Sequence, residues 1–186
     1  MNHPALYLIP APLGDTPPSQ VLPADHIETV RRLSCFIVEE LRTARRYLSV
    51  LGLRVGSLEF ELLNEHTPPE DLDRLLDSLR QGRSVGMITE AGLPAVADPG
   101  AGLVALAHTY GFRVIPLVGP SSLMLALMAS GLNGQHFAFR GYLPVKPPQR
   151  DKRIRELERI SALERQTQIC IETPYRNESL FRAFLG

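Results

Sequence analysis

Acids, glycines, prolines and hydroxyl side chains gather at four points of the chain, each directly after a short apolar run. Carboxylates at such points could act as general bases or accept hydrogen bonds from the hydroxyl groups of a sugar. Glycines would let the backbone approach a ligand closely, because they carry no Cβ atom. The four segments are residues 10–15, 39–42, 89–94 and 118–122.

Several other kinds of chemistry fit the sequence poorly. Neither Ser121 nor Ser122 lies in a Gly-x-Ser-x-Gly turn, so a serine nucleophile is not supported. The first segment has neither a Gly-x-Gly-x-x-Gly motif nor the lysine of a P-loop. Paired carboxylates for hydrolysis stay open, because the sequence does not fix the separation of Glu39, Glu40 and Glu90. The five histidines are scattered without metal-ligand spacing, so no metal site is expected.

Each segment also has a plain structural interpretation. Gly14 and Asp15 are typical of a turn, and the serine pair of the fourth segment is typical of a helix cap. Glu39 and Glu40 could cap the basic helix that follows them. The functional interpretation therefore rests on the occurrence of all four segments together.

Alternating strands and helices position these segments. Apolar runs predict the strands, and helical spacing of apolar residues predicts the helices between them. This alternation predicts a parallel α/β sheet with right-handed crossovers. Since ligands bind outside the carboxyl ends of parallel strands, all four segments should lie on that edge. The expected strands are residues 5–9, 35–38, 58–63, 84–88 and 112–116, and the expected helices are residues 43–51, 68–80, 102–110 and 123–130.

Two further helix starts carry a capping signal. Asp25 is expected to cap a helix whose apolar residues Ile27 and Val30 recur at helical spacing. Asp98 is expected to cap the helix that starts near Gly100, with a proline at its first position.

The strand and helix pattern restarts past residue 131. We therefore predict two α/β domains, residues 1–117 with a parallel sheet and residues 118–186 with a mixed sheet that is incomplete at Gly186. The second domain is expected to contain strands at residues 137–142 and 168–171 and helices at residues 152–163 and 177–185.

Composition limits the class of partner and the compartment. The formal net charge is +0 and the pI is about 7.0, so any nucleic-acid site would have to be a local basic patch. Cys35 and Cys170 lie far apart in apolar runs, which is typical of buried thiols and favours a cytoplasmic protein. Prolines and glycines interrupt residues 114–132, the most apolar segment, so no membrane span is expected.

The one basic cluster spans residues 146–159. Its arginines Arg150, Arg153 and Arg155 could follow a phosphate backbone. Glutamates are interspersed among them, so a solvated face of a mixed-charge helix is the alternative.

Six motifs of the chain occur in the order seen in the tetrapyrrole methylase superfamily, and together they cover nearly the whole sequence. They most resemble the branch that methylates the 2'-hydroxyl of a cytidine in small-subunit (16S) ribosomal RNA. The motifs are residues 7–14, 38–42, 89–100, 115–122, 139–144 and 172–176.

The resemblance implies a methyltransferase that uses S-adenosylmethionine (SAM), built from two α/β domains with the cofactor between them. It also implies a homodimer that acts on ribosomal RNA or the 30S subunit. Because a neutral ribose hydroxyl is a poor nucleophile, Glu40 and Arg42 are proposed as catalytic residues. The implied cofactor contacts are Pro12, Leu13, Gly14, Glu90, Ala91, Gly92, Leu93, Ser121, Ser122 and Glu172.

The chain departs from the RNA-methylating branch in two motifs. That branch typically has Ser-Asp-Ala-Gly-Thr-Pro where this chain has Thr-Glu-Ala-Gly-Leu-Pro at residues 89–94. It has Glu-Asp-Thr-Arg where this chain has Glu-Glu-Leu-Arg at residues 39–42. Two alternatives therefore stay open: methylation of a tetrapyrrole or another small acceptor, and a protein of this fold that binds SAM without turnover. Members of the superfamily continue past the equivalent of Gly186, so part of the adenine pocket is expected to be missing.

Overall fold

The computed structural model describes residues 3–186 of the chain. The chain divides into two compact units, the first ending at Ser121 and the second spanning Ser122–Gly186. The predicted boundary, between residues 117 and 118, lies four residues before this division. Each unit has its own sheet and its own core.

The first unit contains five parallel strands in the order β3-β2-β4-β1-β5. Strands β2 and β4 are buried at every residue, as expected for the centre of a parallel sheet covered on both faces. The register places Val38 of β2 beside Ile88 of β4, so these two strands end side by side. The strands are β1 Ala5–Ile9, β2 Cys35–Val38, β3 Glu59–Leu62, β4 Val85–Ile88 and β5 Arg113–Pro116.

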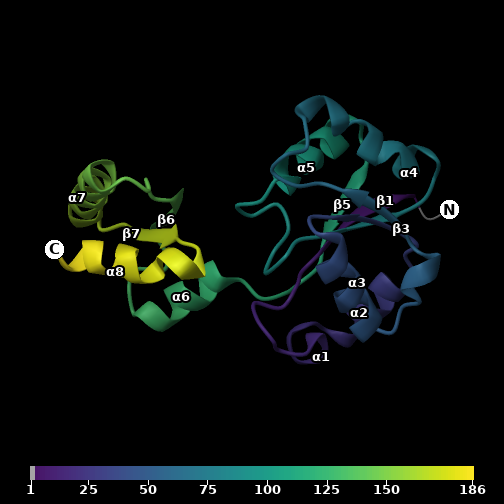
Figure 1. The fold of residues 1–186 in the computed structure, drawn as a ribbon, viewed down its shortest axis with the longest axis horizontal. Coiled ribbons are helices and arrows are strands. Elements are labelled where there is room, and N and C mark those ends of the chain that lie inside the picture. The colour runs from purple at the N-terminus through teal and green to yellow at the C-terminus, as the bar shows by residue number, and fades with distance from the viewer. Residues whose placement is uncertain (1–2) are drawn as a thin grey trace. The chain divides into compact units, whose positions relative to one another are not determined.

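Helices cover both faces of this sheet (Figure 1). Neighbouring strand residues point to opposite faces, so Phe36 joins one core and Ile37 the other. Leu48 of α3 is fully buried in the first core, and Leu103 of α5 is fully buried in the second. Burial of such a side chain contributes about 1.5–3 kcal/mol relative to leaving it exposed. The helices are α1 Pro18–Val21, α2 Ala24–Arg31, α3 Leu41–Val50, α4 Asp77–Arg80 and α5 Gly100–Thr109.

The continuous helix predicted for residues 68–80 is wrong. Two 3-10 turns, Pro69–Asp71 and Arg74–Leu76, precede the short helix α4. The backbone carbonyl of Asp73 accepts the N–H of Leu76, three residues on, and also Nη1 of Arg80 at 2.8 Å. These two donors replace the i+4 bond that would continue an α-helix. Leu75, Leu76 and Leu79 of this segment are nevertheless buried, and Leu72 is partly buried.

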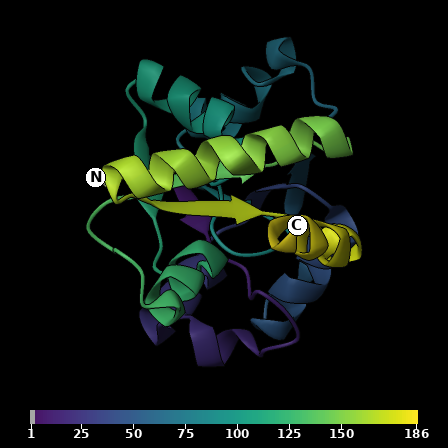
Figure 2. The ribbon, with the colours of Figure 1, turned by 90° about the vertical axis from the view of Figure 1, so that its left-hand side faces the viewer.

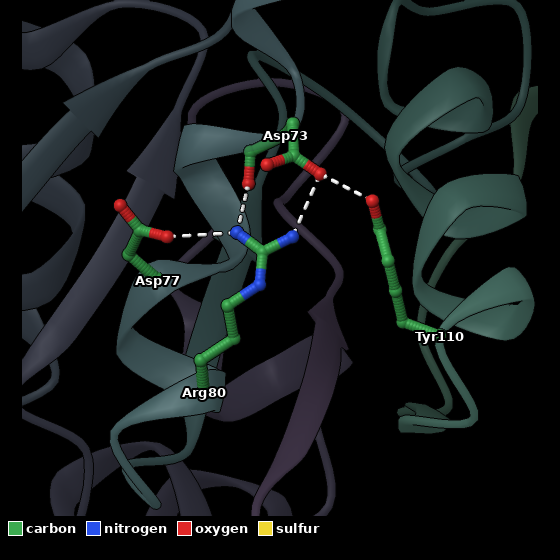
Figure 3. A network of polar contacts seen from close by, with 4 residues as sticks. All are labelled: Asp73, Asp77, Arg80 and Tyr110. Atoms are coloured by element: carbon green, nitrogen blue, oxygen red, sulfur yellow. Dashed lines mark hydrogen bonds and ion pairs between the residues drawn. The ribbon is translucent and has the colours of Figure 1, made fainter.

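Arg80 is the centre of a polar network on the exposed side of this segment (Figure 3). Its guanidinium donates to the carboxylates of Asp73 and Asp77, each at 2.7 Å. The Tyr110 hydroxyl donates to the same Asp73 oxygen at 2.7 Å, and Arg80 lies 4.9 Å from the centre of its ring. The network therefore joins the segment before α4 to the residue that ends α5.

Helix α2 also corrects a prediction. It begins at Ala24 with Pro23 in the cap position, and no side chain caps it. Asp25 lies within the first turn, where its carboxylate still interacts favourably with the helix dipole. The preceding proline fixes the extended backbone that the cap position requires.

The second unit contains two parallel strands and three helices (Figure 2). Leu143, Leu157 and Leu180 form its buried core, with Ile154 and Ile160 packed against them. The described sheet of this unit is a single parallel pair and not the mixed sheet that was predicted. Within residues 3–186, no helix has the length and apolar character needed to cross a membrane. The elements are α6 Ser122–Ser130, β6 Phe137–Tyr142, α7 Pro147–Glu164, β7 Thr167–Ile171 and α8 Asn177–Leu185.

Helix α7 begins five residues before the predicted start at residue 152. The prolines Pro147 and Pro148 occupy its first two positions. Proline fits there because its missing N–H would have no partner within the helix.

Candidate functional site

The loops that follow β1 and β4 are joined by a pair of backbone hydrogen bonds. The N–H of Ala11 donates to the carbonyl of Gly92 at 2.9 Å, and the N–H of Gly92 donates back to Ala11 at 3.0 Å. Gly92 has φ +74°, a left-handed conformation that costs a residue with a side chain about 1–2 kcal/mol. A Cβ atom at Gly92 would also lie 3.3 Å from Leu13. The backbone conformation thus favours glycine at this position, and a side chain would in addition displace the exposed Leu13 slightly.

The loop after β5 packs against the same place. A Cβ atom added at Gly119 would lie closer than 3.0 Å to the ring of Pro10, a distance that real Cβ atoms essentially never show. Pro10 is fully buried, and its carbonyl accepts a hydrogen bond from the Tyr47 hydroxyl at 2.7 Å. The carbonyl oxygen of Pro120 lies 3.7 Å from the point where a Gly92 Cβ would stand. Three loops therefore meet at the carboxyl edge of the sheet.

These three loops carry the cofactor-binding residues predicted for the first unit. Residues 12–14 follow β1, residues 90–93 follow β4, and Ser121 ends the loop after β5. Glu90 and Ala91 are exposed, and the Glu90 side chain has no hydrogen-bond or ion-pair partner in the described part of the chain. Their role in binding a cofactor stays a prediction.

Asp98 has a structural role in the second half of the long loop. Its Oδ1 accepts the N–H groups of Ala95 at 2.8 Å and Gly100 at 2.7 Å. It therefore caps the start of α5, although Pro99 occupies the cap position itself. Burial raises the pKa of the Asp98 carboxyl, while the hydrogen bond from Gly100 opposes this shift. Ala95 and Ala97 adopt left-handed backbone, with φ of 65° and 60°.

The two acids that follow β2 have different partners. Glu40 is the N-cap of α3 and accepts the N–H groups of Arg42 at 2.9 Å and Thr43 at 2.6 Å. The backbone hydrogen bond from Arg42, followed by that from Thr43, lowers the pKa of Glu40. Glu39 instead turns toward β4, where its Oε2 accepts the Thr89 hydroxyl at 3.0 Å and the Glu90 N–H at 3.2 Å. Glu39 thus ties the ends of β2 and β4 together.

Glu39 was not among the predicted site residues, whereas Glu40 and Arg42 were. The Arg42 side chain is exposed and has no hydrogen-bond partner among the described residues. The catalytic roles of Glu40 and Arg42 stay predictions. The importance of Glu39 depends on β2 being next to β4, and this strand order cannot be inferred from the position of Glu39 in the sequence.

A cavity of about 380 Å³ lies between the loop after β1, helix α3 and the ends of β2 and β4. The Tyr47 ring contributes to its wall, and burial raises the pKa of the Tyr47 hydroxyl, which therefore stays protonated. The remaining wall combines apolar side chains with ionisable ones. The apolar residues include Pro12, Pro17, Pro18, Ala44 and Val50, and the ionisable residues are Asp15, Glu39, Glu40, Glu90 and Arg46.

Glu172 holds a turn in the second unit. Its side chain is only 7% exposed, and Oε1 accepts the Thr173 N–H at 2.7 Å and Nε of Arg176 at 2.8 Å. Burial opposes ionisation, but the hydrogen bonds from Thr173 and Arg176 outweigh it and lower the pKa of Glu172. Ser122 begins α6 in the same unit. Contacts of Glu172 and Ser122 with a cofactor stay predictions.

The three predicted RNA-binding arginines differ in their surroundings. The Arg150 side chain is 15% exposed and is bonded to Ser179 and Asp151. Arg153 forms an ion pair with Glu156 at 3.1 Å. Arg155 is exposed and has no such partner in the described chain, so it is the arginine best placed to reach a phosphate. Residues 3–186 contain no group of three or more histidines, cysteines or acids that could hold a metal ion.

Proteins named ribosomal RNA small subunit methyltransferase I are similar to this chain over most of its length. The protein of Mesorhizobium japonicum is 37% identical over 174 residues, which cover 94% of this chain and 56% of the relative. That of Xylella fastidiosa is 36% identical over 174 residues, covering 92% and 59%. The chain belongs to the tetrapyrrole methylase superfamily, in the branch of these relatives. It spans a little over half the length of the curated relatives it matches.

A solved member of the superfamily confirms the fold. The crystal structure of uroporphyrin-III-C-methyltransferase from Thermus thermophilus matches with a TM-score of 0.52 and 22% identity. The match covers 77% of this chain and 65% of the other. No protein-family model matches the chain. The predicted α/β fold of the superfamily is therefore confirmed by the parallel sheet and by this match.

Proposed function

We propose that the protein is a SAM-dependent methyltransferase acting on the 2'-hydroxyl of a cytidine in small-subunit (16S) ribosomal RNA. The names of the relatives support methyl transfer to small-subunit ribosomal RNA, and the resemblance of the six motifs supports the cytidine 2'-hydroxyl as the acceptor. The observation that carries the proposal is the hydrogen-bonded pair of Ala11 and Gly92, which joins two of the three loops expected to hold the cofactor.

The residues present at these loops fit a cofactor of this kind. Gly14 is exposed, and a Cβ atom there would meet nothing within 4 Å, so the backbone is open to a ligand. The Glu90 carboxylate has no partner in the described chain and can accept hydrogen bonds from ribose hydroxyls. Pro12, Leu13, Ala91, Gly92, Leu93 and Ser121 would complete the contacts from the first unit.

SAM supplies an activated methyl group on its sulfonium, so the protein chiefly has to position the acceptor oxygen in line with that group. Backbone hydrogen bonds from Arg42 and Thr43 lower the pKa of Glu40 below the ordinary glutamate value, so its ionised form is stabilised further. Since a carboxylate with three hydrogen-bond donors accepts a proton reluctantly, its proposed role is to orient the ribose hydroxyl. Arg42 lies in the first turn of α3, two residues after Glu40, and would supply positive charge beside the Glu40 carboxylate.

The proposed partner is ribosomal RNA within the 30S subunit, and the proposed location is therefore the cytoplasm. Arg155 would contact the phosphate backbone, with Arg150 and Arg153 on the same helix as weaker contributors because they are already paired. A homodimer is proposed from the resemblance to the superfamily. Sedimentation equilibrium of the chain tests this, and a single monomeric species would contradict it.

Two measurements test the function. Calorimetric titration with SAM and with S-adenosylhomocysteine should show saturable binding, and Gly92→Val should weaken it. Incubation of the chain with methyl-labelled SAM and small-subunit ribosomal RNA should then place the label on a 2'-O-methylcytidine. Absence of SAM binding would refute the proposed methyltransferase activity, while label on another acceptor would refute the proposed cytidine substrate.

Crosslinking tests the RNA contact separately. Arg155→Gln should reduce crosslinking to ribosomal RNA more than Arg153→Gln does, because Arg153 is neutralised by Glu156. Equal crosslinking by both variants and the wild type would exclude this helix from the RNA interface.

A further inference from the structure

The 380 Å³ cavity of the first unit differs from the three loops expected to hold the cofactor, although it shares Pro12, Gly14 and Glu90 with them. It opens at the carboxyl edge of the parallel sheet, where ligands of such folds bind. Its volume is near the lower end of the range for small-molecule pockets, which run from about 300 to 1,000 Å³. Such a space accommodates one nucleoside and excludes a helical stem.

The walls of the cavity select the part of a nucleotide that could enter. Tyr47, Ala44 and the prolines present apolar surface suited to a planar ring. Four carboxylates face one guanidinium, that of Arg46, so a phosphate would be repelled from the interior. A base would therefore enter while its phosphates stay outside, as in enzymes that extrude the target nucleotide from the surrounding stack.

Glu39 is the carboxylate of this cavity that is fixed by hydrogen bonds to one of its oxygens while the other oxygen can still accept a hydrogen bond from a ligand. It is half-buried, and its Oε2 is fixed by the Thr89 hydroxyl and the Glu90 N–H. Its Oε1 has no hydrogen-bond partner in the described chain. Both oxygens of Glu40, in contrast, are engaged at the start of α3, and Asp15 lies on an exposed loop.

We propose that Glu39 recognises the exocyclic amino group of the acceptor's base in this cavity. The inference rests on the proposed methylation of an RNA nucleoside, since that reaction brings a base to this edge of the sheet. A carboxylate accepts hydrogen bonds only, so it pairs with the amino group of cytosine. It has no proton to donate to the carbonyl oxygen that uracil carries at the same position. Glu39 is thus a specificity-determining residue.

Free nucleosides test the cavity without any contribution from phosphate contacts. Cytidine and uridine are titrated separately into the isotopically labelled chain, and the backbone amide resonances are followed by nuclear magnetic resonance. The Glu90 amide is a direct reporter, because its N–H donates to Glu39. Cytidine should shift it with a dissociation constant about 5- to 10-fold lower than that for uridine, in line with the discrimination of one base contact.

The Glu39→Gln variant should lose or reverse this preference. Its side-chain oxygen can still accept the Thr89 and Glu90 hydrogens, which turns its amide NH₂ toward the cavity, where it donates to uracil. Glu28→Gln, which removes a carboxylate from α2 that pairs with Arg31 outside the cavity, is the matched control and should keep the wild-type preference. Retention of the cytidine preference by Glu39→Gln would overturn the proposal.

A ligand-side test does not depend on how the variant folds. N4,N4-dimethylcytidine has no amino hydrogen, so it should bind the wild-type chain as weakly as uridine. Equal affinities for cytidine, uridine and the dimethyl analogue, or shifts confined to amides outside the cavity, would refute the role of Glu39. Calorimetry with SAM on the same sample separates the two claims. Loss of SAM binding contradicts the proposed function, whereas loss of nucleoside discrimination with intact SAM binding contradicts only this inference.

Discussion

Substitution of Gly119 by alanine tests how the loops of the first unit meet. The added Cβ atom would lie within 3.0 Å of two atoms of the Pro10 ring, whereas carbon atoms in contact prefer about 3.5–4.0 Å. Neither side can yield easily. Pro10 is fully buried, its ring is rigid, and its carbonyl is held by the Tyr47 hydroxyl. The loop after β5 must therefore move away from β1 by roughly 1–1.5 Å to restore a normal carbon contact.

We expect Gly119→Ala to lower the free energy of unfolding by about 2–3 kcal/mol, the upper part of the range for overpacked sites. For a chain of this size that corresponds to a fall in Tm of roughly 4–10 °C. Because the displaced loop leads to Ser121, SAM binding should also weaken, by about 10-fold if the loop contacts the cofactor.

Urea denaturation and SAM calorimetry measure the two effects on one sample. Gly56→Ala is the control in the same unit, since a Cβ atom there would meet nothing within 4 Å. It should change stability by less than about 0.5 kcal/mol. Wild-type stability and wild-type SAM affinity in Gly119→Ala would refute the packing of Gly119 on Pro10. A loss of stability with unchanged SAM affinity would remove the loop after β5 from the cofactor site.

Three other substitutions have defined outcomes. Gly92→Ala should destabilise the chain by about 1–2 kcal/mol in urea denaturation, because φ at this residue is +74°. An unchanged denaturation midpoint would contradict the left-handed backbone conformation of Gly92. Tyr47→Phe should cost about 1–3 kcal/mol, because it leaves the buried Pro10 carbonyl without its donor, and a neutral result would mean that another donor replaces it. Asp73 has a lowered pKa, chiefly because Arg80 donates to it, so its stabilising contribution is present above the ordinary aspartate pKa and is lost as pH falls through the lowered value. The stability difference between wild type and Asp73→Asn should therefore shrink on acidification, and a difference independent of pH would refute the ion pair.

The strands β1, β2 and β4 were predictable because each is a short apolar run closed by polar or turn-forming residues. Burial of every residue in β2 and β4 follows from two-sided coverage, which an uninterrupted run such as residues 35–38 already indicates. Residues 68–80 were not predictable in the same way. Leucines three and four residues apart fit a 3-10 turn and an α-helix alike. The Arg80 side chain, which competes for the Asp73 carbonyl, decides between them only in three dimensions.

The meeting of the loops was predictable from one rule, that the carboxyl ends of parallel strands share an edge. Which loops touch depends on strand order, and order is a property of tertiary packing. The sequence predicts that residues 10–15 and 89–94 lie on one edge, but only the placement of β1 beside β4 explains why Ala11 bonds to Gly92.

Glu39 and Glu40 show why neighbouring identical residues acquire different roles. Glu40 has the extended backbone of an N-cap, so its side chain folds over the first turn of α3 and its oxygens are used there. Glu39 is still aligned with the end of β2, and its side chain reaches across to β4. The helix that begins at Leu41 therefore engages both oxygens of Glu40 in its first turn, whereas Glu39 is anchored by a single oxygen. The start of α3 at Leu41 thus explains why Glu39, and not Glu40, keeps one oxygen without a hydrogen-bond partner among the described residues.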